Sequence, residues 1–148
     1  MLFFFTYLKR IILLLLLYTC SRLFFYFHNI DYYNPRIIEF IEGVRFDISA
    51  LLYINIPLFI LLLFPNNLRE RKKYSQFTNF LFYAFNIPFI ILNNVDIEYF
   101  KYTQKRSTGD FFQLLKLGQD AQNIIPIYIK EYWLISLFTI IQIWLILK

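Results

Sequence analysis

The chain has 148 residues, of which 59% are hydrophobic and 22% aromatic, and its formal charge is +5. A soluble domain typically has about 45–50% apolar residues, so this composition excludes an ordinary water-soluble fold and predicts an all-α, polytopic membrane protein. Binding to nucleic acid explains the positive charge less well than a membrane topology does. Lys and Arg are dispersed between apolar runs, as they are in the cytoplasmic loops of membrane proteins.

The first apolar run predicts a transmembrane helix over residues 11–27. A secretory signal peptide with a weak cleavage box ending at Cys20 is the alternative, but apolar character resumes at residues 23–27, too far along for a signal. Arg22 lies inside this run, and a cation in lipid is costly unless it reaches the interface or an anion. The sequence does not identify its partner.

Three further runs predict transmembrane helices, over residues 48–64, 77–95 and 132–147. Each is close to the length that crosses a hydrocarbon core of about 30 Å at about 1.5 Å per residue. Residues 69–73 are basic and cannot lie in lipid, so the second and third runs form a membrane hairpin. The sequence therefore predicts about four spans.

Two short amphipathic helices are expected to lie in the membrane interface. Asn34 suits an N-cap, Pro35 suits the first helical position and Gly43 suits the position after the end, which predicts the first of these helices over residues 34–43. The same kinds of signal predict the second over residues 107–118.

A short repeat links the two helices of the hairpin. The triplet Asn-Ile-Pro occurs at Asn55 and again at Asn86. Asn55 lies ~12 Å below Asp47 and Asn86 lies ~15 Å below Asp96, counted along helices. We therefore predict that the two amides lie at similar depth and hydrogen-bond across the hairpin. A chance match in a chain rich in Asn and Ile is the alternative.

The distribution of charge predicts the orientation of the chain in the membrane. If the N-terminus is cytoplasmic, the dense basic segment of residues 69–73 is also cytoplasmic, and most of the acidic residues lie in the outer segments. This arrangement follows the positive-inside rule and predicts a multi-pass protein with a cytoplasmic N-terminus.

Catalytic chemistry is not apparent in the sequence. The chain has one His, His28, and one Cys, and it has too few Gly residues for a phosphate-binding loop. A lone interfacial His is more often an ordinary surface residue than a ligand. We therefore expect this chain to contain no catalytic residue, metal site or cofactor of its own.

Polar residues at the outer interface are the candidates for binding. Two polar stretches at this interface, residues 43–47 and 93–108, supply cations and hydroxyls that suit a phosphate-bearing lipid headgroup. The candidate headgroup residues are Arg45, Lys105, Arg106, Ser107 and Thr108. The alternative is that these bases pair with acids such as Asp47 and Asp96, or face water.

The same stretches carry a family resemblance that covers nearly the whole chain. The segments EGVRFDISALLYIN, NNVDIEYFKYTQKRSTGDFF and KEYW resemble the membrane portion of bacterial lipoteichoic-acid-synthase-like proteins. These are phosphoglycerol transferases of the alkaline phosphatase/sulfatase superfamily. The resemblance implies a bundle of about five spans followed by an extracytoplasmic catalytic domain. That domain has a Thr nucleophile and a divalent metal, and it transfers phosphoglycerol from phosphatidylglycerol.

None of that family's catalytic or metal residues maps onto a position in this chain. The resemblance therefore implies a domain of the bacterial plasma membrane that stops before the fifth span and the catalytic domain, and whose outer surface helps to present phosphatidylglycerol. A sulfatase or phosphoethanolamine transferase parent is one alternative. A self-contained small membrane scaffold or transport subunit is another.

Overall fold

The computed structural model describes residues 2–31, 37–69, 71–103 and 130–148, and in these ranges the regular structure is helical, with no strand. The helices are α1 (Leu2–His28), α2 (Ile37–Ile54), α3 (Ile56–Leu62), α4 (Asn66–Arg69), α5 (Lys72–Thr103) and α8 (Trp133–Leu147). The prediction of an all-α fold is confirmed for these residues.

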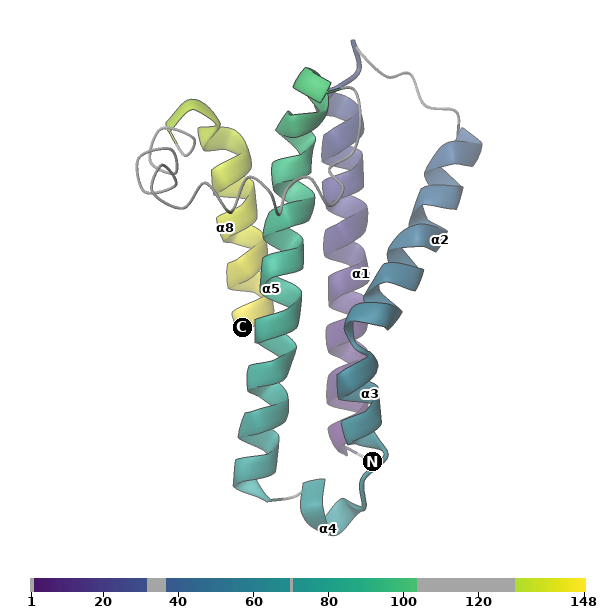
Figure 1. Cartoon of the computed structure of the whole chain (residues 1–148), viewed down its shortest axis with the longest axis vertical. Helices are drawn as coiled ribbons and strands as arrows, with labels where there is room; N and C mark the ends of the chain where they lie inside the picture. Colours follow the sequence, from purple (N-terminus) through teal and green to yellow (C-terminus); the bar gives the residue numbers. More distant parts are fainter. Residues whose placement is uncertain (1, 32–36, 70, 104–129) are drawn as a thin grey trace.

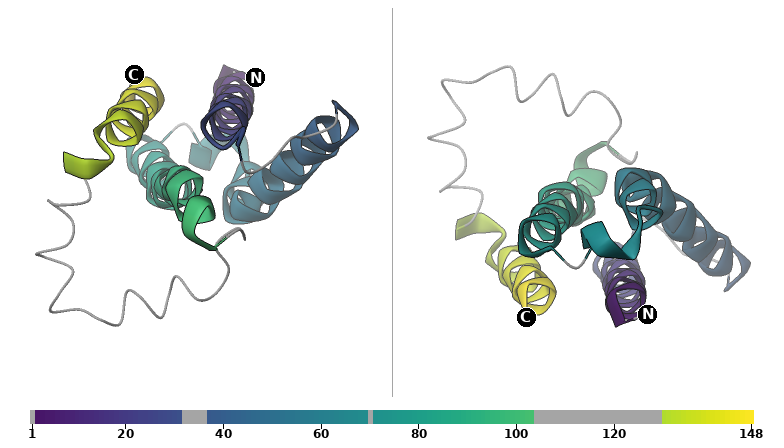
Figure 2. Two further views of the ribbon diagram at one scale, coloured as in Figure 1. Left: turned by 90° about the horizontal axis from the view of Figure 1, so that it is seen from above. Right: turned by 90° about the horizontal axis from the view of Figure 1, so that it is seen from below.

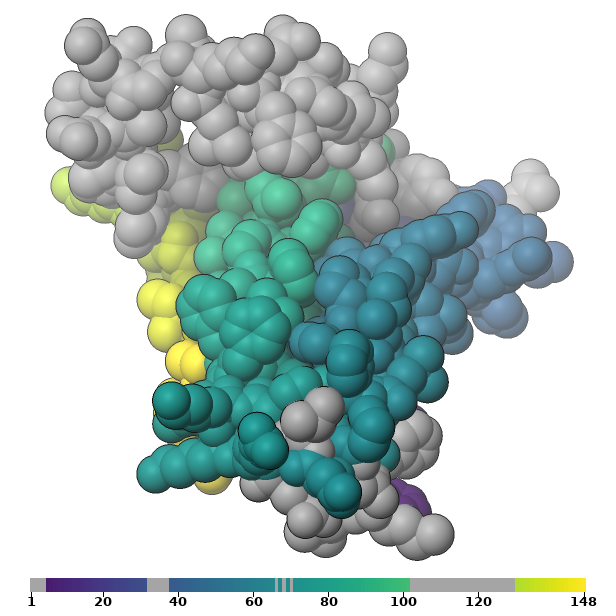
Figure 3. All heavy atoms as spheres, turned by 60° about the horizontal axis from the view of Figure 1, so that its bottom comes forward, coloured from purple at the N-terminus to yellow at the C-terminus, as the bar shows by residue number. Residues whose placement is uncertain are grey.

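The helices form a bundle built around α1 and α5. Both run along the long axis of the molecule, and α8 packs against both of them (Figure 1). α2 packs on α1, and α3 packs on α5. Seen along the bundle axis, the N-terminal end of α2 lies farther from the other helices than its C-terminal end does (Figure 2). Side chains fill the space between the ribbons of α5 and α3 (Figure 3).

The number of helices that are long and apolar enough to cross a membrane is smaller than predicted. Two helical segments, residues 5–28 of α1 and 72–101 of α5, meet this test, and the pair α2 and α3 makes a third if it is counted as one bent span. α8 has 15 residues, which corresponds to only about 22 Å of helix, less than a ~30 Å core. Two or three of the roughly four predicted spans therefore meet this test.

The helix boundaries also differ from those predicted. α1 begins well before residue 11, and α5 extends beyond residues 77–95 at both ends. The span predicted over residues 48–64 is broken, because α2 and α3 meet at an angle of 58° next to Asn55. Pro57 lies in the first turn of α3, where the N–H that it lacks is not needed, whereas Pro88 of the same triplet lies inside α5 without ending that helix.

The predicted interfacial helix over residues 34–43 is not a separate element. α2 passes through Gly43 without interruption, so the prediction that Gly43 ends a helix is wrong. Glycine inside a helix lowers helix stability by roughly 1 kcal/mol relative to alanine. The presence of Gly43 in the middle of α2 therefore needs an explanation other than a helix end. The predicted helix over residues 107–118 lies outside the described residues.

The distribution of side chains differs from that in a soluble bundle: the core is apolar, but it also holds several buried amides, and the surface is rich in apolar side chains. Many large apolar side chains face outward, and the fully buried side chains include Asn29, Asn55, Asn86 and Asn94, each 0% exposed. Burial of amides inside a bundle whose outer surface is apolar is expected when the surroundings are lipid, because polar groups must then find partners within the protein.

Candidate functional site

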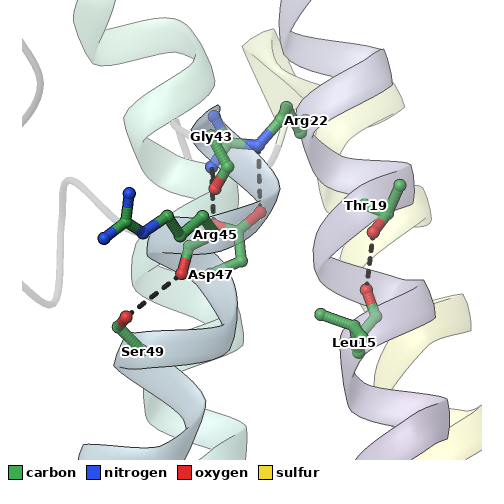
Figure 4. A network of polar contacts seen from close by, with 7 residues as sticks. All are labelled: Leu15, Thr19, Arg22, Gly43, Arg45, Asp47 and Ser49. Atoms are coloured by element: carbon green, nitrogen blue, oxygen red, sulfur yellow. Dashed lines mark hydrogen bonds and ion pairs between the residues drawn. The ribbon is translucent and has the colours of Figure 1, made fainter. Parts of the chain in front are cut away.

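The half of the bundle that contains the C-terminal end of α1 holds a buried ion pair that joins α1 to α2. Arg22 on α1 donates from Nε to Oδ2 of Asp47 at 2.9 Å and from Nη2 to Oδ1 at 2.6 Å, and Nη2 also donates to the carbonyl of Gly43 at 2.8 Å (Figure 4). Both charged residues are 8% exposed. The bidentate geometry compensates the charge of Arg22 inside the bundle, which identifies the partner that the sequence left open.

The ion pair explains Gly43. A Cβ atom at this position would lie 2.1 Å from Nη1 of Arg22, so the guanidinium would have to move from its place against the helix. Glycine is therefore present because the guanidinium packs directly on the helix backbone, and it neither caps nor ends the helix. The same helix turn then presents Asp47 to Arg22, so that residues 43 and 47 form one binding face for the arginine.

Arg45 does not belong to this pair. Its side chain points away from Asp47 (Figure 4), and it lies on the exposed face of α2, where Glu42, Phe46 and Ser49 line an open hollow with it. The alternative in which Arg45 neutralises Asp47 is therefore wrong, since Arg22 occupies the carboxylate. Arg45 remains at the surface, accessible to solvent or to a headgroup.

The other candidate headgroup residues lie outside the described part of the chain. These are Lys105, Arg106, Ser107 and Thr108. α5 ends at Thr103, two residues before the first of them. Asp96, which was expected at the outer end of the third span, is 7% exposed on α5. A headgroup site formed by Arg45 together with these four residues therefore stays a prediction.

The predicted contact between the two asparagine residues of the repeat is present. Asn55 donates to Oδ1 of Asn86 at 3.1 Å, and Asn86 donates back to Oδ1 of Asn55 at 2.9 Å. Each amide also donates to a backbone carbonyl four residues earlier, that of Leu51 or Phe82. Every hydrogen of the two amides is thus used, which confirms the predicted bond and fixes the bend at Asn55 against α5.

A second polar cluster, which the sequence analysis missed, joins three helices. Asn94 on α5 accepts from Ser21 on α1 at 2.8 Å and donates to Gln142 on α8 at 2.7 Å. Gln142 in turn donates to Ser21 at 2.9 Å and to the carbonyl of Leu17 at 3.1 Å. The signal was available, because Gln142 is the one amide side chain in the mostly apolar final run, but its partners are distant in sequence.

At the C-terminal turns of α1 and α5, ionisable side chains meet. His28 lies 2.5 Å from Glu98 and 2.7 Å from Lys101, measured from Nε2 of the ring. The adjacent Asn29 donates to the carbonyls of Phe25 and Ile97 at 3.1 Å each, which joins the two helix ends. His28 was interpreted from the sequence as an ordinary interfacial residue, and its place in this cluster was not predicted.

Comparisons with known protein families, with curated proteins and with solved structures find no match.

Proposed function

We propose that this chain is a membrane-embedded helical domain that anchors a bacterial phosphoglycerol transferase of the lipoteichoic-acid-synthase type. The observation that best supports a bilayer setting is an apolar exterior around buried, hydrogen-bonded amides. Asn55, Asn86, Asn94 and Gln142 are buried and hydrogen-bonded, whereas outward-facing residues such as Leu63 are largely exposed and apolar. Lipid tolerates an apolar exterior, and buried amides then hold the helices together.

The family assignment within this proposal rests on the quoted sequence segments alone. In this proposal α1, α5, the bent pair α2 and α3, and the short α8 all cross the plasma membrane, with the N-terminus in the cytoplasm. Transferase chemistry, together with its divalent metal, belongs to an extracytoplasmic domain of the parent protein. The contribution of this chain is to anchor that domain and to hold lipid substrate near it.

The lipid-presenting role requires cations at the level of the outer headgroups. Arg45 supports it, because its guanidinium lies on the outer half of α2, exposed and directed away from the buried ion pair. Lys105, Arg106, Ser107 and Thr108 follow α5 in the sequence and supply two more charges and two hydroxyls. Arginine and lysine bind phosphate oxygens through charge-assisted hydrogen bonds.

Binding of phosphatidylglycerol to the purified chain in neutral detergent tests the headgroup site. The variant Lys105→Gln/Arg106→Gln is expected to bind about 5- to 25-fold more weakly, on the scale of two hydrogen-bonded charges at about 0.5–1 kcal/mol each. Lys72→Gln/Lys73→Gln removes the same charge at the opposite end of α5 and is expected to leave binding unchanged. Equal binding by the unmodified chain and by both variants rejects the headgroup site.

A further inference from the structure

The cluster at the outer ends of α1 and α5 is separate from the proposed headgroup residues and consists of His28, Glu98 and Lys101. The side chain of Glu98 is 7% exposed, and those of His28 and Lys101 are each 27% exposed. Nε2 of His28 lies 2.5 Å from Oε1 of Glu98 and 2.7 Å from Nζ of Lys101. Nζ of Lys101 also lies 3.3 Å from Oε2 of Glu98.

The two contacts at Nε2 require opposite states of the nitrogen. An ammonium group has no lone pair, so a bond between Lys101 and His28 requires Nε2 to accept. An ionised carboxylate has no proton, so a bond between His28 and Glu98 requires Nε2 to donate. One nitrogen carries either the lone pair or the proton, and it therefore satisfies only one of these partners at a time.

Besides these charges, an aromatic ring contacts the imidazole. Phe24 stacks on His28 at 5.5 Å between ring centroids, and Phe138 of α8 stacks on Phe24 at 4.9 Å. The other described charged residues toward this end are Asp31, Lys130 and Glu131, which are exposed, Asp96 on α5, which is buried, the buried pair of Arg22 and Asp47, and Glu39, Glu42 and Arg45 on α2. Glu98 and Lys101 are thus the charges that contact the imidazole among the described residues.

We propose that these three residues form a proton-operated switch at the outer end of the bundle. With neutral imidazole, Nε2 accepts from Lys101, and Lys101 also pairs with Glu98. When a proton from the outer solution binds Nε2, the ring donates to Glu98, and the resulting imidazolium repels the ammonium beside it. Histidine is the side chain that most readily gains a proton near neutral pH, so an imidazole is suited to drive such an exchange.

The Lys101 ammonium is then released from His28 and keeps only the contact with Oε2 of Glu98, at 3.3 Å, at the partly exposed end of the bundle. A lysine head there is available to an anion, and the phosphate of a lipid headgroup has the matching charge. This last step rests on the proposed function, because it adds one cation to the headgroup residues that follow α5. The exchange of partners at His28 does not depend on it.

The tautomer of His28 tests the switch, and the chain has no other His, so ¹⁵N-labelled histidine gives the signal of one residue. At about pH 9 the unmodified chain is expected to carry its ring proton on Nδ1, leaving Nε2 to accept from Lys101. Lys101→Met is expected to convert the ring to the Nε2–H tautomer, which donates to Glu98. Lys73→Met, at the opposite end of α5, is the matched control and is expected to preserve the Nδ1–H form.

A proton on Nε2 in the unmodified chain at that pH overturns the switch, and this measurement needs no variant to fold. The same tautomer in the unmodified chain and in Lys101→Met, with helicity intact by circular dichroism, also overturns it.

Binding of phosphatidylglycerol at about pH 5.5 and pH 8 tests the release of Lys101. The unmodified chain is expected to bind about two- to fivefold more tightly at the lower pH, the scale of one exposed charge pair. His28→Asn is expected to bind equally at both. If the tautomer exchange occurs while lipid binding does not change with pH, the release step is rejected. The headgroup site itself is then judged by the Lys105 and Arg106 variant at a single pH.

Discussion

At the scale of single residues, the contact between Arg22 and Asp47 controls how α2 attaches to α1. Each charge is buried and compensated by the other, so removal of one partner leaves the second without compensation. Breaking a buried ion pair in this way typically costs about 3–5 kcal/mol. We expect Asp47→Asn to lower the free energy of unfolding in mixed micelles by this amount, measured by titration with sodium dodecyl sulfate and followed by circular dichroism.

Arg45→Met is the matched control for this prediction. Arg45 is on the same helix as Asp47, two residues away, but its side chain is exposed, so its removal is expected to change the free energy of unfolding by less than about 0.5 kcal/mol. Similar losses in Asp47→Asn and Arg45→Met would contradict the structural role of the ion pair.

At the scale of the helix, the bend between α2 and α3 depends on the bond between Asn55 and Asn86. Asn55→Leu leaves the amide of Asn86 buried with unpaired groups, and Asn86→Leu does the reverse. We expect each variant to lose about 1–2 kcal/mol of unfolding free energy, measured by the same titration. The double variant removes both amides, so its loss of unfolding free energy is expected to be smaller than the sum of the losses in the two single variants.

Asn67→Leu provides the control, because Asn67 is exposed in α4 between the two helices of the hairpin. It is expected to retain the stability of the unmodified chain. Additive losses in Asn55→Leu/Asn86→Leu would show that the two side chains act independently, against the observed pair of bonds.

The helices also show which features a single sequence can predict. The pairing of Asn55 with Asn86 was predictable, because both residues precede a proline at matched depth in adjacent runs and the connection between them is short. The ends of the helices were not. Gly43 was interpreted as a stop signal, whereas its glycine is required by the guanidinium of Arg22, a residue from another helix. Local signals do not contain that information.

The polar contacts between distant helices were beyond prediction for the same reason. Asn94 meets Gln142 across 48 positions of sequence, and His28 meets Glu98 across 70. Hydropathy places each of these residues in or beside an apolar run, but it does not define which face of each helix turns toward which neighbour. The headgroup site remains a prediction from sequence, because Arg45 is the only one of its candidate residues that the structure describes.

At the scale of the whole molecule, the direction of the chain in the bilayer determines which of these clusters faces the cell exterior. Asp31 follows α1 at one end of the bundle, and Lys73 lies at the start of α5 at the other, both exposed (Figure 1). Basic segments such as the one around Lys73 are retained in the cytoplasm. The ion pair of Arg22, the cluster of His28 and the exposed Arg45 then all lie in the outer half.

Labelling of intact bacteria with a membrane-impermeant maleimide measures this direction. In a Cys20→Ser background, which removes the native thiol, Asp31→Cys is expected to react in intact cells, and Lys73→Cys is expected to react only after lysis. Lysed cells provide the control for reactivity, since both thiols must then be labelled. The opposite pattern would place Arg45 and His28 on the cytoplasmic side. Neither residue would then meet lipid or protons at the outer surface, and both proposals for that surface would be rejected together.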